Sequence, residues 1–242
     1  MPYSPQLCES LTSEAHEICA QLDLTLLALG NATSGALPVR SIEHLSQGAG
    51  RRVGILAHCL TTIFEKFPPG SAAPLERPVL YDVQVAHHAF VVNLYGFFEN
   101  LAWAFILRHA LETKVGGRKN IGLFLKSTQR LLPVPIRDYL ASPTMVAWHN
   151  DYLKNYRDAL AHRVPLYIPP SAISDTDVAE LMSLRERERV AILERNWNVL
   201  EEIRERESAV GRPCFFLCTR SVTTRIPDQS TCTHKCFAMQ RR

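Results

Sequence analysis

The sequence lacks any long uninterrupted run of apolar residues. Its most apolar stretches, residues 24–29 and 101–107, are far shorter than the roughly 20 residues that a membrane-spanning helix needs. The N-terminus carries Glu9, Glu14 and Glu17, has no basic start and shows no cleavage site after an apolar run, so it does not resemble a secretory signal. These absences predict a soluble cytoplasmic protein with no membrane association.

An excess of charge of one sign is also missing. The 27 Lys and Arg residues against 24 Asp and Glu residues give a net charge of +3. This is too small for a nucleic-acid signature over the whole chain, so any basic binding surface must be local. Hydrophobic residues make up 46% of the 242 residues, which is enough for a core and excludes wholesale disorder.

Two further absences concern sheets and disulfides. No segment alternates apolar and polar residues for long enough to predict a sheet. The cysteine count of seven is odd, and Cys8, Cys19 and Cys59 lie in segments with helical patterning. This arrangement suits buried free thiols in a reducing compartment better than a disulfide framework.

Helical periodicity, by contrast, is abundant. Apolar residues recur at steps of three and four in residues 7–30, 51–67, 79–114, 144–162 and 175–208, with a shorter helix at 121–131. Residues 79–114 contain no proline and are apolar nearly all round, which predicts a buried central helix with a kink at Gly96. The sequence therefore predicts an all-α bundle, a single helical domain over residues 1–210.

Charged residues gather at the end of the fourth main helix, in the stretch "NYRDALAHRV". A guanidinium such as Arg157 binds phosphate oxygens through a planar fork, and an imidazole such as His162 exchanges a proton near neutral pH. Cleavage of RNA needs a proton taken from a 2′-hydroxyl, a proton given to the leaving 5′-oxygen, and compensation of phosphorane charge. Arg157 and His162 could supply these functions without a metal.

Geometry and electrostatics also allow a structural interpretation of the same residues. On a straight helix, residues five apart are separated by about 140° around the axis, so Arg157 and His162 do not share a face. Pro165 predicts that the helix ends just after His162, which would let the pair converge on a substrate at the helix end or on a dimer axis. A basic residue and a histidine in a last turn are, however, also what a helix C-terminus favours.

The segment resembles the R-x4-6-H signature of HEPN domains. Arg157 matches the arginine, Asp158 the polar residue that follows it, and His162 the histidine. The resemblance covers roughly residues 79–170, where "LYGFFENLAWAFIL" with Glu99 and Asn100 resembles the family's earlier helix. It implies a HEPN-like helical bundle with a long central helix, here extended by an extra C-terminal helix and an irregular tail.

The resemblance also implies a function. Family members act as homodimers in which two motifs form a metal-independent endoribonuclease, in toxin–antitoxin, phage-defence or RNA-processing settings with an antitoxin or other protein partner. Others have lost cleavage and bind RNA, nucleotides or proteins. Around Arg157, Asp158 and His162, supporting roles are expected for Glu99, Asn155, Tyr156 and Arg163. A helical interaction protein with no nucleic-acid role is the third hypothesis.

The last residues, 211–242, differ in composition from the rest of the chain. Thiolates and imidazole are zinc ligands, and such residues occur here as Cys214, Cys218, Cys232, His234 and Cys236. The C-x3-C spacing is looser than the usual C-x2-C knuckle. The sequence therefore favours a disordered tail over a zinc site, and we expect no cofactor elsewhere.

Overall fold

The computed structural model describes residues 3–215, and every regular element in this range is a helix. No strand occurs there, and an isolated antiparallel bridge joins Ala172 to Arg212. The prediction of an all-α fold is confirmed for these residues. The elements are α1 (Pro5–Thr33), α2 (Val39–Ile42), η1 (Glu43–Gly50), α3 (Arg51–Lys66), α4 (Arg77–Arg108), η2 (Arg118–Asn120), α5 (Lys126–Gln129), α6 (Val134–Leu140), α7 (Pro143–Ala147), η3 (Trp148–Lys154), α8 (Asn155–His162), α9 (Asp175–Leu193) and α10 (Trp197–Ala209).

Contacts divide the chain into two compact units. We call residues 12–65 and 85–165 the motif unit, because it contains Arg157 and His162. The hairpin unit contains residues 3–11, 66–84 and 166–215 of the described chain. The predicted domain over residues 1–210 spans both units.

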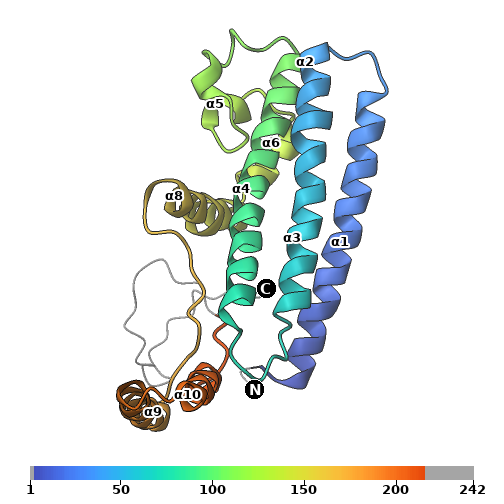
Figure 1. The fold of residues 1–242 in the computed structure, drawn as a ribbon. Coiled ribbons are helices and arrows are strands. Elements are labelled where there is room, and N and C mark those ends of the chain that lie inside the picture. The colour runs from blue at the N-terminus through green and yellow to red at the C-terminus, as the bar shows by residue number, and fades with distance from the viewer. Residues whose placement is uncertain (1–2, 216–242) are drawn as a thin grey trace. The chain divides into compact units, whose positions relative to one another are not determined.

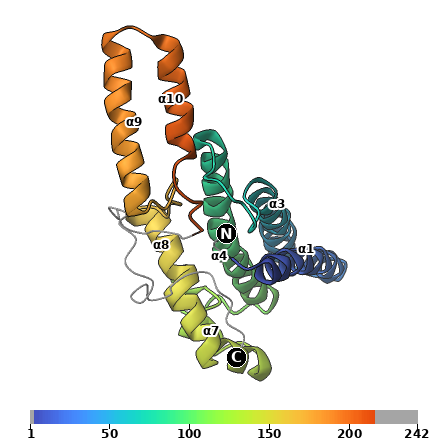
Figure 2. The same cartoon turned by 90° about the horizontal axis from the view of Figure 1, so that it is seen from below.

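Within the motif unit, α1, α3 and α4 lie side by side and alternate in direction (Figures 1 and 2). One buried cluster joins these helices through Leu29, Leu45, Val53 and Ala104. The buried Ser41 hydroxyl donates a hydrogen bond to the Ala104 carbonyl at 2.9 Å, so this polar group costs little in the core. A second cluster packs the C-terminal half of α4 against the segments that follow it, through Ala102, Ile106, Val115, Ile121, Leu123, Leu132 and Leu140.

The helix α4 is continuous through Gly96, the residue at which a kink was predicted. A Cβ placed on Gly96 would lie 2.5 Å from Cζ of Arg52. The Arg52 side chain extends across α4 and donates from Nη1 to Oδ1 of Asn93 at 2.9 Å. The glycine therefore allows a close approach between an α3 arginine and the α4 backbone.

Two predicted segments in the motif unit differ from the structure. The central helix ends at Arg108 rather than near residue 114, because Ala110 adopts a left-handed conformation with φ of 49°. Of the helix predicted over 121–131, only α5 forms. Two side chains of α5 bond to the residues before it: the Thr128 hydroxyl accepts from the Gly122 amide and the Ser127 hydroxyl donates to the Asn120 carbonyl. These side-chain bonds replace helical hydrogen bonds over residues 120–122.

The hairpin unit contains two antiparallel helices where the sequence predicted one helix over 175–208. The α9–α10 hairpin packs through Leu184, Ala191, Leu200, Ile203 and Val210. It turns at residues 194–196, where Arg195 has φ of 53° and the Asn196 side chain accepts from the Val199 amide. The single-helix prediction is wrong here because Asn196 begins a second helix as its N-cap.

The helix α4 also bears on the predicted absence of membrane association. An 18-residue window in α4 has a mean hydropathy of 1.4, so this helix is long and apolar enough to cross a membrane. The unbroken apolar runs in the sequence are too short to reveal it. About 28% of that window is buried. A single helix of this kind is weak evidence for a membrane span, because the core helix of a soluble protein also passes this test.

The thiols expected to be buried differ in their surroundings. Cys59 is buried and Cys19 is half-buried, and both are free thiols. Burial raises the pKa of the Cys59 thiol. Cys8 is also only half-buried, so the expectation of a fully buried cysteine holds for Cys59.

A buried histidine on α4 gives the fold a dependence on pH. Both ring nitrogens of His87 are buried, and neither has a hydrogen-bond partner among the described residues. Burial, together with the neighbouring charge of His88, lowers the pKa of His87 to about 4. In the unfolded chain this histidine takes up its proton near pH 6.5, whereas in the folded protein it does so only near pH 4. The free energy of unfolding is therefore highest above pH 6.5 and decreases as the pH falls towards 4.

We expect the free energy of unfolding to fall by up to about 3 kcal/mol over this interval because of His87 alone. Urea unfolding measures the free energy of unfolding at pH values between about 4 and 7. The His87→Phe variant should lose less of this free energy towards pH 4 than wild type does. The exposed histidine His58 on α3 supplies the matched control, His58→Phe. An acid dependence that is the same in wild type and His87→Phe would contradict the prediction.

Candidate functional site

The motif lies on one continuous helical segment built from α7, η3 and α8. The Ser142 side chain caps its start by accepting from the Met145 amide. The segment ends at His162, and Arg163 is already extended, with φ of −132° and ψ of −161°. The predicted helix over 144–162 and its end before Pro165 are therefore confirmed. The π-helical turns of η3 were not predicted.

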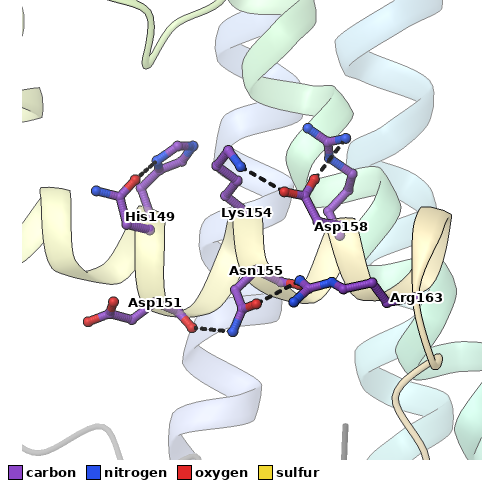
Figure 3. A network of polar contacts seen from close by, with 8 residues as sticks. His149, Asp151, Lys154, Asn155, Asp158 and Arg163 are labelled. Carbon is purple, nitrogen blue, oxygen red and sulfur yellow. Dashed lines mark hydrogen bonds and ion pairs between the residues drawn. The ribbon is translucent and has the colours of Figure 1, made fainter.

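An open hollow of about 460 Å³ lies on the polar side of this segment. Its lining residues are Asn150, Lys154, Asn155, Asp158, His162 and Arg163. Figure 3 shows Lys154 and Asp158 along one edge of the helix and Asn155 and Arg163 along the other. The hollow therefore brings a histidine together with two cationic side chains and two amides.

The carboxylate of Asp158 is held between two cations. Lys154 Nζ lies 2.7 Å from Oδ2, and Arg157 Nη1 lies 3.0 Å from Oδ1. The hydrogen bond from Lys154 is the main reason that the pKa of Asp158 lies below its ordinary value, although partial burial opposes it. Its negative charge is thus compensated inside the site and repels an incoming phosphate less than an unpaired carboxylate would.

Arg157 itself faces α4 rather than the hollow. Its guanidinium carbon lies 4.2 Å from the centre of the Tyr95 ring, which is a cation–π contact. Its Nε atom is buried and has no partner among the described residues. Arg157 is therefore fixed on an aromatic surface and touches the hollow only through Asp158.

Glu99 and His149 complete the surroundings of Arg157. Burial raises the pKa of Glu99 and the Arg157 charge opposes this, but no ion pair joins the two side chains in the part of the chain that the structure describes. The His149 ring stacks on Phe124 with ring centres 3.9 Å apart, and burial lowers the pKa of His149. Glu99 therefore acts on Arg157 through its charge alone, while Tyr95 provides the direct contact.

The other residues expected to support the site have distinct positions. Tyr156 is buried and contributes to packing. Arg163 folds back along α8, and its Nη2 donates to the carbonyl and the side-chain oxygen of Asn155 at 2.8 and 2.7 Å. Asn155 therefore orients Arg163 at the mouth of the hollow.

The structure brings together some members of the predicted site and separates others. His162, Asp158, Asn155 and Arg163 share the hollow, whereas Arg157 does not line it. The 140° offset expected for a straight helix is kept, because both motif residues lie within α8. A composite site formed by two chains stays a prediction.

Sequence reasoning missed Lys154, Asn150 and Tyr95. Lys154 could have been found, because Lys and Asp four residues apart on a helix are a known pairing pattern. Tyr95 is 62 positions before Arg157 in the chain, and no local pattern connects them.

The possible zinc ligands fall largely outside the described residues. Cys214 is described and is buried, while Cys218, Cys232, His234 and Cys236 lie outside residues 3–215. Within that range, no group of three or more His, Cys, Asp or Glu side chains is placed to hold a metal ion.

Comparisons with known proteins found no match to any family model, to any curated protein or to any solved structure.

Proposed function

We propose that this protein is a HEPN-like endoribonuclease that cleaves RNA without a metal ion, as a dimer. The observation that carries the proposal is the hollow, where His162 lies beside Lys154 and Arg163 while Asp158 is neutralised by Lys154 and Arg157. A histidine that shares a hollow with cations can serve phosphodiester transfer, because the histidine moves protons and the cations offset phosphate charge.

The proposed reaction is an internal transesterification. The imidazole of His162 accepts the proton of a ribose 2′-hydroxyl, and the 2′-oxygen forms a bond to phosphorus as the bond to the 5′-oxygen breaks. The protonated His162 then gives its proton to the leaving 5′-oxygen, and the products end in a 2′,3′-cyclic phosphate and a 5′-hydroxyl. Arg163, whose hydrogen bonds go to neutral oxygens of Asn155, offsets the charge of the phosphate oxygens.

Arg157 would act on the same phosphate from a second chain. Its fork is held by Tyr95 and Asp158, and such a fixed guanidinium loses little freedom when it binds phosphate. Because Arg157 does not line the hollow of its own chain, a dimer in which each hollow receives the partner's Arg157 is the arrangement that uses both residues.

The test is cleavage of a labelled single-stranded RNA by purified protein in EDTA. We expect products with 2′,3′-cyclic phosphate ends and unchanged rates when EDTA is added. Products that end in a 3′-hydroxyl, or cleavage that EDTA abolishes, would contradict the proposed chemistry. His58→Ala, an exposed histidine on α3, is the control for histidine replacement.

An inactive RNA- or nucleotide-binding module, with an antitoxin or other protein as a further partner, is the alternative. The same hollow would then hold a phosphate without proton transfer. Binding that weakens with salt in a protein that never cuts RNA would favour this alternative.

A further inference from the structure

One short segment of the motif unit carries many cations and almost no acidic residues. Residues 108–130 contain six Arg and Lys residues and one acidic residue, Glu112. This segment therefore carries a net charge of +5 in a chain whose net charge is +3. We call its six cations the basic end: Arg108, Lys114, Arg118, Lys119, Lys126 and Arg130.

All six side chains of the basic end are exposed. Glu112, the single carboxylate of the segment, already lies near Arg40, with Nη1 and Oε1 3.7 Å apart. In the part of the chain that the structure describes, none of the six cations forms an ion pair. Cations left unpaired on a surface attract polyanions, whereas the mixed charges of α9 and α10 pair with one another.

Hydrogen bonds order the backbone beside three cations of the basic end, Arg118, Lys119 and Lys126. The Asn120 carbonyl, next to Arg118 and Lys119, accepts from the Ser127 hydroxyl at 2.6 Å, next to Lys126. The Asn120 side chain donates to the Gly116 carbonyl at 2.8 Å. Figure 1 shows α5 beside the C-terminal end of α4. The backbone that carries Arg118, Lys119 and Lys126 is therefore held by local hydrogen bonds.

The basic end adjoins the hollow through one aromatic contact. Phe124, two residues before Lys126, stacks on His149 with ring centres 3.9 Å apart and planes 15° apart. His149 in turn bonds through Nδ1 to Oδ1 of Asn150, at 3.0 Å, and Asn150 lines the hollow. The segment that carries the basic end and the helix that carries the hollow are therefore linked by packed side chains of the same unit.

We infer that the basic end binds the phosphates of a single-stranded RNA on one side of the nucleotide that is held in the hollow. Spaced surface cations next to a small site match a polyanion with regularly spaced charges. The inference rests on the proposed function for the identity of the polyanion as RNA. An anionic lipid surface is the competing partner of a basic surface, and it becomes an outcome of the test.

The test compares two triple variants of the full chain, each in a His162→Ala background so that RNA stays intact. The first removes cations of the basic end, as Arg118→Gln, Lys119→Gln and Lys126→Gln. The control removes three exposed cations elsewhere, as Arg51→Gln, Arg187→Gln and Arg195→Gln. Both lose the same charge, so a general loss of positive field affects them equally. Circular dichroism confirms that each is folded.

Binding of a labelled RNA of about 20 nucleotides, longer than the sites such surfaces usually occupy, is measured by anisotropy at several salt concentrations. We expect the first triple to weaken binding by at least about tenfold and to reduce the slope of log K against log salt by about 2. The control triple should stay within about twofold of the parent protein. Equal RNA binding by the two triple variants would overturn the inference. It would also be overturned if the protein bound phosphatidylserine vesicles through the basic end but did not bind RNA.

A second measurement separates this inference from the proposed function. With His162 restored, the first triple should cut a dinucleotide at the wild-type rate and a long RNA more slowly, because a dinucleotide does not reach the basic end. RNA binding that needs the basic end in a protein that cuts nothing would sustain the inference and end the nuclease proposal. If the first triple variant cut both substrates at the wild-type rate, the nuclease proposal would stand and the inference about the basic end would be rejected.

Discussion

Replacing His162 by alanine is expected to lower the single-turnover rate of RNA cleavage by about 10²- to 10⁴-fold, the usual contribution of a general acid or base. His162 is exposed at the last turn of α8 and lines the hollow, so the change removes the proton acceptor without leaving a cavity in the core. The melting temperature should stay close to that of wild type. The rate is measured with excess enzyme on a labelled RNA in EDTA, beside His58→Ala.

Arg157 should matter for a different reason. Arg157→Ala removes a fixed guanidinium and is expected to lower the same rate by about 10²- to 10³-fold. Arg157→Lys keeps the charge but cannot both stack on Tyr95 and donate to Asp158 as a planar fork, so it should recover little activity. Unchanged cutting by both His162→Ala and Arg157→Ala would leave the helix-end interpretation as the explanation of the motif.

Mixing the two inactive variants tests the dimer directly. If each hollow combines His162 of one chain with Arg157 of the other, a mixed dimer of His162→Ala and Arg157→Ala chains has one intact site and one doubly defective site. Refolding the variants together should restore part of the activity, while each alone stays inactive. A mixture that stays inactive although mixed dimers form would show that both residues act within one chain.

The end of the motif helix is the part of the site that the sequence predicted best. Pro165 disfavours helical geometry at Val164, and α8 ends at His162. The offset between Arg157 and His162 follows from helical geometry alone, and the structure keeps it. Local rules suffice for these features because the residues involved are neighbours in the chain.

The features that were not predicted depend on contacts between distant residues. Tyr95 under Arg157 and Arg52 across Gly96 both join helices that are far apart in the sequence. The break before α10 depends on Asn196 competing as an N-cap inside a charged helical pattern, which periodicity does not register. Gly96 illustrates the difference: the sequence marked it as unusual, but the reason lies in α3.

The stability of the motif unit is expected to depend strongly on Leu56, on α3. Its side chain is 1% exposed, and removing three of its carbon atoms both loses burial and leaves a cavity between packed helices. We expect Leu56→Ala to lower the free energy of unfolding by about 2–5 kcal/mol. Leu27 on α1 is 65% exposed, so Leu27→Ala makes the same chemical change with an expected cost below about 0.5 kcal/mol.

Urea unfolding followed by circular dichroism measures both variants. Because the hollow lies in the same unit as Leu56, Leu56→Ala should also lose RNA cleavage at a lower temperature than wild type, while its rate well below the transition stays normal. Equal costs for the two leucines would contradict the packing of α3. A rate that falls at every temperature would instead indicate that Leu56 supports the geometry of the site and not only the stability of the unit.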